Sequence, residues 1–91
     1  MIEREVTAMT MLEVEVPSRA LSALRTGAAE FAREMRLLAA VKLFELGRLS
    51  SGRAAELAGL SRVEFLLALR RYEVSPFQVT PEELREDLRN A

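Results

Sequence analysis

The side chains best suited to recognition chemistry in this chain are one serine and several arginines in its second half. They are Arg53, Ser61, Arg62 and Arg70. A guanidinium group can bind guanine or phosphate, and a serine hydroxyl can bind phosphate. Residues 47–72 carry five arginines and two glutamates, a net charge of +3, whereas residues 73–91 have a net charge of −3. The pattern predicts a modest attraction to nucleic-acid phosphates, centred on residues 47–72.

Groups for catalysis are scarce in the same sequence. The 91 residues include no Cys and no His, which excludes thiolate nucleophiles, imidazole bases, zinc fingers and disulfides. Lys42, Tyr72 and the carboxylates remain, and the carboxylates are spread as on a solvated surface. We therefore expect no enzyme, no metal, no cofactor and no small-molecule substrate. Aromatic residues make up 5% of the chain, which argues against a base-stacking surface for single strands.

Length and composition predict one small, mainly α-helical domain. Hydrophobic residues make up 49% of the chain and charged residues 30%, and Ala, Leu, Glu and Arg favour helix. We expect residues 1–9 to form a loose arm, residues 10–75 a strand and a helical core, and residues 76–91 a C-terminal arm. Met9 and Met11 are alternative natural starts to Met1. Neither a signal peptide nor a membrane span is expected, so we predict a cytoplasmic protein.

Residues 49–74 have the pattern of a helix-turn-helix. Ser51 is expected to cap a helix over residues 52–58, and Gly59 to supply the left-handed turn residue. Ser61 then begins a second helix, with Glu64 completing a capping box. The first helix is rich in small side chains that allow close packing, namely Ala54, Ala55 and Ala58. This spacing predicts two short helices joined by a tight turn.

The two faces of the second helix differ in what they can bind. At 100° per residue the core face is expected to hold Phe65, Ala68, Leu69 and Tyr72. The outward face carries Arg62, Val63, Leu66, Leu67 and Arg70. Three aliphatic side chains on that face are not typical of base recognition. We expect them to be covered by a second subunit, by the C-terminal arm or by a foreign protein.

The segment Thr10 to Val16 alternates apolar and polar residues and so predicts one half-buried strand. A lone strand needs a partner, which is most simply its own copy across a two-fold axis, so we expect a homodimer. The opposite face of this strand carries Glu13 and Glu15, which phosphates repel, so we do not expect it to read DNA.

Two helices are expected between this strand and the helix-turn-helix. A short one runs from Ser18 to about Arg25, and a long one from about Ala28 to Leu46, ending at Gly47. Two neighbouring apolar stripes lie on the long helix, one with Phe31, Met35, Leu38 and Val41 and the other with Leu37, Val41 and Phe44. This helix is either a central core helix or one that also packs against a second subunit.

The C-terminal arm begins where Val74, Ser75 and Pro76 end the second helix of the motif. The run SPFQVTPEEL is expected to be extended before a short final helix with Thr80 as its N-cap. We predict that the arm contributes partner-binding residues, namely Phe77, Val79, Leu84, Arg85, Leu88 and Arg89. The alternative is a tail that folds back over Leu66 and Leu67.

Over about Leu12 to Leu88 the chain resembles uncharacterised protein family 0175. The resemblance is carried by the run REMRLLAAVKLFELGRLSSGRAAELAGLSRVEFLLALRRYEVSPF, with LEVEVP before it and TPEELREDL after it, and AAELAGLS is its most specific part. Members are small prokaryotic proteins regarded as antitoxins of PIN-type ribonucleases. The resemblance implies that this chain sequesters a toxin and represses the shared operon. Arg85 or Arg89 would then compete with the metal in the acidic site of the toxin, or the acidic tail would contact a basic rim.

These observations together predict a homodimeric, antitoxin-like helix-turn-helix protein that binds a toxin and operator DNA. One alternative is a dimeric transcriptional regulator without a toxin. The other is a protein-binding adaptor that does not contact DNA.

Overall fold

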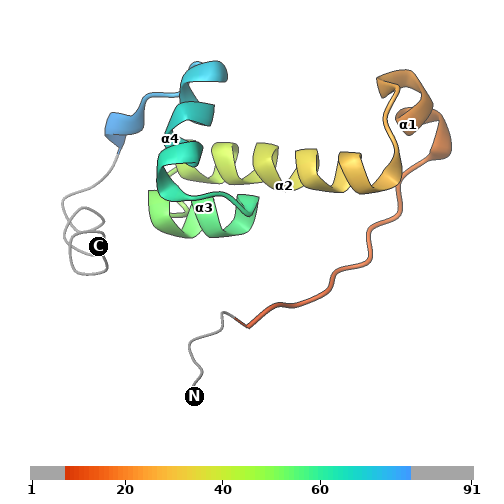
Figure 1. Cartoon of the computed structure of the whole chain (residues 1–91), viewed down its shortest axis with the longest axis horizontal. Coiled ribbons are helices and arrows are strands. Elements are labelled where there is room, and N and C mark those ends of the chain that lie inside the picture. The colour runs from red at the N-terminus through yellow and green to blue at the C-terminus, as the bar shows by residue number, and fades with distance from the viewer. Residues whose placement is uncertain (1–7, 79–91) are drawn as a thin grey trace.

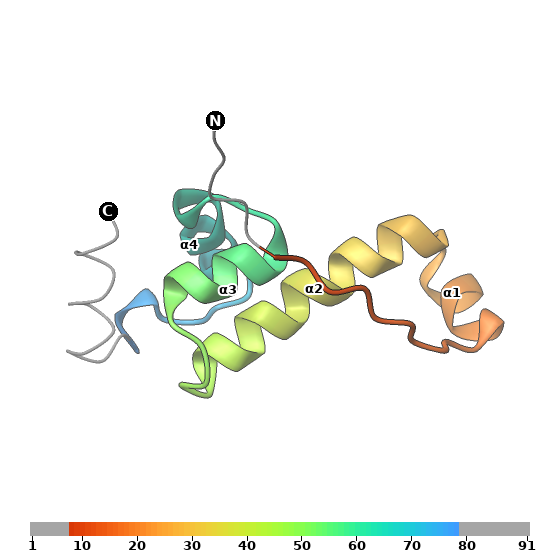
Figure 2. The same ribbon diagram turned by 90° about the horizontal axis from the view of Figure 1, so that it is seen from below.

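The computed structural model describes residues 8–78, which contain four α-helices and one short 3-10 turn. The elements are α1 (Ser18–Leu24), α2 (Ala28–Glu45), α3 (Ser51–Ala58), α4 (Arg62–Arg71) and η1 (Pro76–Gln78). Figures 1 and 2 show α1 at one end of the long helix α2, with α3 and α4 gathered at the other end. None of the helices in the described range is long and apolar enough to cross a membrane.

The helix boundaries follow local signals in the sequence. Gly47 adopts a left-handed conformation with φ of 76° directly after the last turn of α2. The N–H of Arg48 then donates to the carbonyl oxygen of Leu43 at 2.8 Å, which satisfies a carbonyl group at the helix end. The predicted stop at Gly47 is confirmed.

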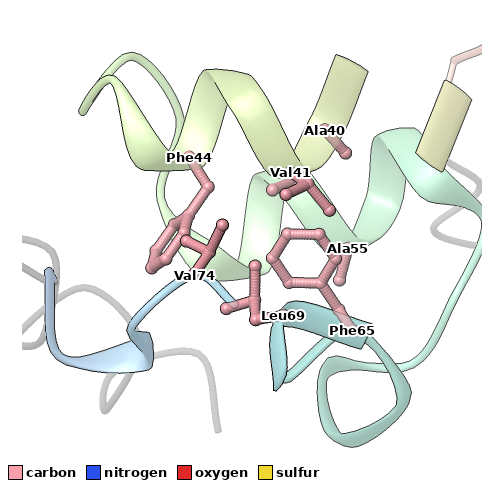
Figure 3. Close-up of a cluster of buried hydrophobic side chains, with 8 residues drawn as sticks. Ala40, Val41, Phe44, Ala55, Phe65, Leu69 and Val74 are labelled. Carbon is pink, nitrogen blue, oxygen red and sulfur yellow. The ribbon is translucent and has the colours of Figure 1, made fainter. Parts of the chain in front are cut away.

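The hydrophobic core lies where α2, α3 and α4 meet (Figure 3). Its buried side chains are Ala40, Val41 and Phe44 from α2, Ala54 and Ala55 from α3, Phe65 and Leu69 from α4, and Val74 after α4. The rings of Phe44 and Phe65 meet edge to face, with centroids 5.9 Å apart and planes at 89°. Because Ala54 and Ala55 are small, α3 can approach the other two helices closely.

The predicted N-terminal strand over Thr10–Val16 is wrong. No strand occurs in residues 8–78, and residues 8–17 run without regular structure ahead of α1. Leu12 and Val14, expected on the buried face, are exposed. Alternating residues suit a strand only when another strand accepts its backbone hydrogen bonds, and the described chain offers none.

The expected apolar stripe on α2 is divided between two environments. Val41 is buried in the core, but Leu38 is exposed and Phe31 and Met35 are half-buried outside the core cluster. The core residues that α2 contributes lie in its C-terminal half, and Nε of Arg36 donates to the carbonyl oxygen of Leu57 in α3 at 2.8 Å. The first turns of α2 extend beyond the α3–α4 pair (Figure 1).

Tyr72 was expected in the core and is exposed instead. Helix α4 ends at Arg71, and Tyr72 is its C-cap, with the guanidinium carbon of Arg71 5.6 Å from the ring centroid. Glu73 then turns the chain with φ of 58°, and the N–H of Val74 donates to the carbonyl oxygen of Leu69 at 2.9 Å. This reversal buries Val74 in place of Tyr72.

The segment after α4 also differs from the expectation of an extended run. Residues Pro76–Gln78 form the turn η1, and the Ser75 hydroxyl oxygen accepts from the N–H of Phe77 at 3.1 Å. A serine side chain can stabilise such a turn by accepting a hydrogen bond from the backbone N–H two residues later in the chain. The predicted helix that begins at Thr80 lies outside the described residues.

Candidate functional site

The helix-turn-helix forms as the sequence predicts. Gly59 has φ of 73° and ends α3, and Leu60 packs against the core at the corner. The Ser61 hydroxyl oxygen accepts from the N–H of Glu64 at 3.1 Å, and the carboxylate of Glu64 accepts from the N–H of Ser61 at 2.8 Å. This reciprocal capping box fixes where α4 starts and therefore which side chains it turns outward.

One serine differs from its predicted role. Ser50, not Ser51, caps α3, because its hydroxyl oxygen accepts from the N–H of Arg53 at 3.2 Å. Ser51 is fully buried, and its hydroxyl oxygen accepts from Nε of Arg62 at 3.1 Å. Ser51 therefore links α3 to the first residue of α4, a role for which the sequence gives no local signal because the two residues are eleven positions apart.

A groove runs along the outward face of α4 and is closed at one side by η1. It has a volume of about 630 Å³. Its lining residues are Arg62, Val63, Leu66, Leu67 and Arg70 from α4, and Pro76 and Phe77 from η1. We call this site the α4–η1 groove. All five residues predicted for the outward face of α4 line it, and so does the predicted partner-binding residue Phe77.

The α4–η1 groove is apolar at its centre and basic at two of its lining positions. Val63 is 67% exposed, Leu67 59% and Phe77 90%, so these side chains offer much of their surface to a ligand. Arg62 and Arg70 supply positive charge, and no acidic residue from the described range 8–78 lines the groove. The groove therefore suits an apolar group accompanied by a negative charge.

The arginines predicted to bind DNA occupy different environments. Arg53 lies on α3, where its Nη1 is 3.4 Å from Oε1 of Glu56 in an exposed ion pair. Arg62 donates to Ser51, as described above, and Arg70 is exposed on α4. Arg62 and Arg70 thus lie on α4, which Ser61 caps, whereas Arg53 belongs to α3.

Sequence reasoning missed Pro76 as a lining residue. Only the turn of η1 brings Pro76 beside α4, and the sequence was expected to be extended there. The remaining predicted partner-binding residues lie outside the described range, so the structure does not place them: Val79, Leu84, Arg85, Leu88 and Arg89. Among residues 8–78 no cluster of three or more His, Cys, Asp or Glu side chains could hold a metal ion.

Comparison with known proteins gives matches over nearly the whole chain. A UPF0175 protein of Aeropyrum pernix is 41% identical over 78 residues, which is 86% of this chain and 90% of that protein. A second A. pernix UPF0175 protein is 40% identical over 82% of this chain and 79% of its own length. A UPF0175 protein of Archaeoglobus fulgidus is 44% identical over 68% of this chain and 70% of its own length.

No solved structure gives a significant match to this one. The family comparison is nevertheless clear, because the sequence model described as Uncharacterised protein family (UPF0175) matches residues 9–91. The helix-turn-helix and the α4–η1 groove both fall within that match. The chain belongs to the uncharacterised protein family UPF0175.

Proposed function

We propose that this protein is an antitoxin-like binding protein that holds a protein partner in the α4–η1 groove. The observation that carries the proposal is the groove itself, which lies along the face that a DNA-reading helix turns toward the bases. Base edges in the major groove are read mainly by hydrogen bonds, which Val63, Leu66 and Leu67 cannot make. Apolar side chains at an exposed site are instead typical of a protein-binding surface.

The charge of the groove narrows the class of partner. Arg62 and Arg70 favour a segment that presents an apolar side chain close to a carboxylate. The chain continues past Phe77 into the residues predicted to bind the partner, so the groove and the C-terminal arm are contiguous in sequence. The resemblance noted in the sequence points to a PIN-type ribonuclease toxin as this partner, and we propose that class.

Leu67 offers a sharp test, because Leu46 is a matched control. Leu67 in the groove is 59% exposed, and Leu46 after α2 is 60% exposed and lies outside the groove. We expect Leu67→Lys to weaken binding of the protein encoded by the neighbouring gene, which the proposal predicts to be a PIN-type ribonuclease, by roughly tenfold or more, which corresponds to about 1.4 kcal/mol. Leu46→Lys should leave binding unchanged, as measured by titration calorimetry with the purified proteins.

Two outcomes would refute the proposed function. Equal affinity of the Leu67→Lys variant and the unmodified chain would place the partner elsewhere. Absence of any binding to the neighbouring protein, together with tight binding to DNA from upstream of the gene, would favour a transcriptional regulator without a toxin. Circular dichroism on both leucine variants controls for loss of helix.

Operator DNA is the second candidate ligand, and the basic helix-turn-helix favours it. Residues 47–72 have a net charge of +3, and Arg70 is exposed on α4. We expect Arg70→Ala to weaken binding to upstream DNA by about 1–3 kcal/mol if Arg70 contacts a base. If the variant lost the same affinity for an unrelated duplex, and if this loss depended strongly on salt, Arg70 would contact a phosphate instead.

A further inference from the structure

The N-terminal half of α2 has an apolar face that the helix-turn-helix core does not cover. Six residues form this face, namely Ala28, Phe31, Ala32, Met35, Leu38 and Ala39. At 100° per residue the centre of this face lies roughly 155° around the helix from the side that carries Leu37, Val41 and Phe44 toward the core. The two halves of α2 therefore turn apolar surface to opposite sides.

The burial of these residues agrees with an unpartnered face. Leu38 is 42% exposed, the three alanines are exposed, and Phe31 and Met35 are half-buried without joining the core cluster. On the other side of this half of the helix lie the charged residues Glu30 and Arg33, both exposed. Helix α1, at the same end of α2, contains no buried residue (Figure 2).

We propose that a second copy of this chain packs on this face, with the two α2 helices antiparallel and the two-fold axis at Met35. In that arrangement Phe31 lies opposite the partner's Leu38 and Ala32 opposite the partner's Ala39. The two large side chains share one flank and the alanines share the other, so the surface is complementary to itself, as a two-fold interface requires. The face holds no charge that its own copy would repel.

The required area also indicates a contribution from α1. A specific interface buries about 800 Å² on each partner. Six side chains, of which three are alanines, do not reach that area alone. Helix α1 has seven residues and ends in the exposed Leu24, and such a short helix needs tertiary contacts to be stable. We therefore assign residues 18–39 as a dimerisation arm, separate from the α4–η1 groove.

Cysteine crosslinking tests the position of the axis, because the natural chain has no Cys. A residue on the two-fold axis meets its own copy, so Met35→Cys should form a disulfide-linked dimer under mild oxidation. Arg33→Cys, on the opposite side of α2, is the matched control and should crosslink at least roughly tenfold more slowly, since its sulfur cannot approach its copy. Non-reducing gels of the full-length variants report both rates. Equal crosslinking of the two variants would overturn the proposal.

Sedimentation of the unmodified chain and two variants gives a readout without oxidation. The unmodified chain should have twice the mass of one chain, and Leu38→Lys should raise the dimer dissociation constant by roughly tenfold or more, because the change occurs twice per dimer. Leu67→Lys, in the α4–η1 groove, should leave that dissociation constant unchanged. A monomeric unmodified chain would overturn the proposal. A dimer that is dissociated by Leu67→Lys but not by Leu38→Lys would also overturn it. These outcomes do not depend on the proposed function, which concerns other residues.

Discussion

The contact between Phe44 and Phe65 joins α2 to α4 and gives a quantitative test of how the helix-turn-helix is held in place. Both side chains are almost completely buried, and their rings meet edge to face at 5.9 Å. Replacing either Phe by Ala would cost about 3–5 kcal/mol, a large part of the stability of a small domain. Replacement by Leu keeps most of the apolar volume while removing the ring, so it isolates the aromatic contact.

The expected free energies follow from that geometry. Each single change, Phe44→Leu or Phe65→Leu, should lower the free energy of unfolding by about 1–1.5 kcal/mol. The ring pair contributes ~0.5–1.5 kcal/mol beyond the buried area. Since either single change already removes this contribution, the double variant should lose less than the sum of the single losses by about the same amount.

Urea denaturation followed by circular dichroism measures these four free energies. Protein concentration is held constant, because association of folded chains raises apparent stability. A second cycle with Phe31→Leu and Phe65→Leu is the control. Because Phe31 lies outside the core cluster, the free energies lost in these two single variants should add in the double variant. A coupling energy near zero between Phe44 and Phe65 would refute the reasoning, as would equal coupling in both cycles.

Two further predictions concern helix ends. Ser61→Ala should lower the free energy of unfolding by about 1 kcal/mol, because the N–H of Glu64 loses its acceptor; an unchanged urea midpoint would show that the cap is not needed. Glu73→Gly should raise the free energy of unfolding by ~0.5–1 kcal/mol, because Glu73 adopts φ of 58° and glycine tolerates this conformation. Glu73→Ala is the control, because it removes the charge but keeps the Cβ atom. An equal gain in the free energy of unfolding from both changes would assign the effect to charge.

Much of the local structure was predictable because its signals lie within a few residues. Gly47 and Gly59 mark left-handed helix ends, and Ser61 and Glu64 cap each other across a single turn. The phase of α4 follows from that cap, so the five outward residues could be identified from periodicity. Three of the four residues predicted for its core face, Phe65, Ala68 and Leu69, are buried.

Features that depend on distant residues could not be predicted in the same way. Ser50 and Ser51 are equivalent as caps in the sequence, and the hydrogen bond from Arg62 to Ser51 distinguishes them. By helical periodicity Tyr72 falls on the core face of α4. The periodicity does not show that α4 ends at Arg71, one residue before Tyr72. The alternation at Thr10–Val16 likewise does not show whether another strand is available.

The sequence by itself determined the helices, the turn between α3 and α4 and the apolar character of the outward face of α4, because short-range hydrogen bonds and side-chain periodicity control these features. Only the tertiary structure decided that Val74 enters the core and that Pro76 and Phe77 then close the α4–η1 groove. It also decided which half of α2 packs against the helix-turn-helix. Both outcomes depend on how helices pack over one another, and packing joins residues whose spacing in the chain carries no periodic signal.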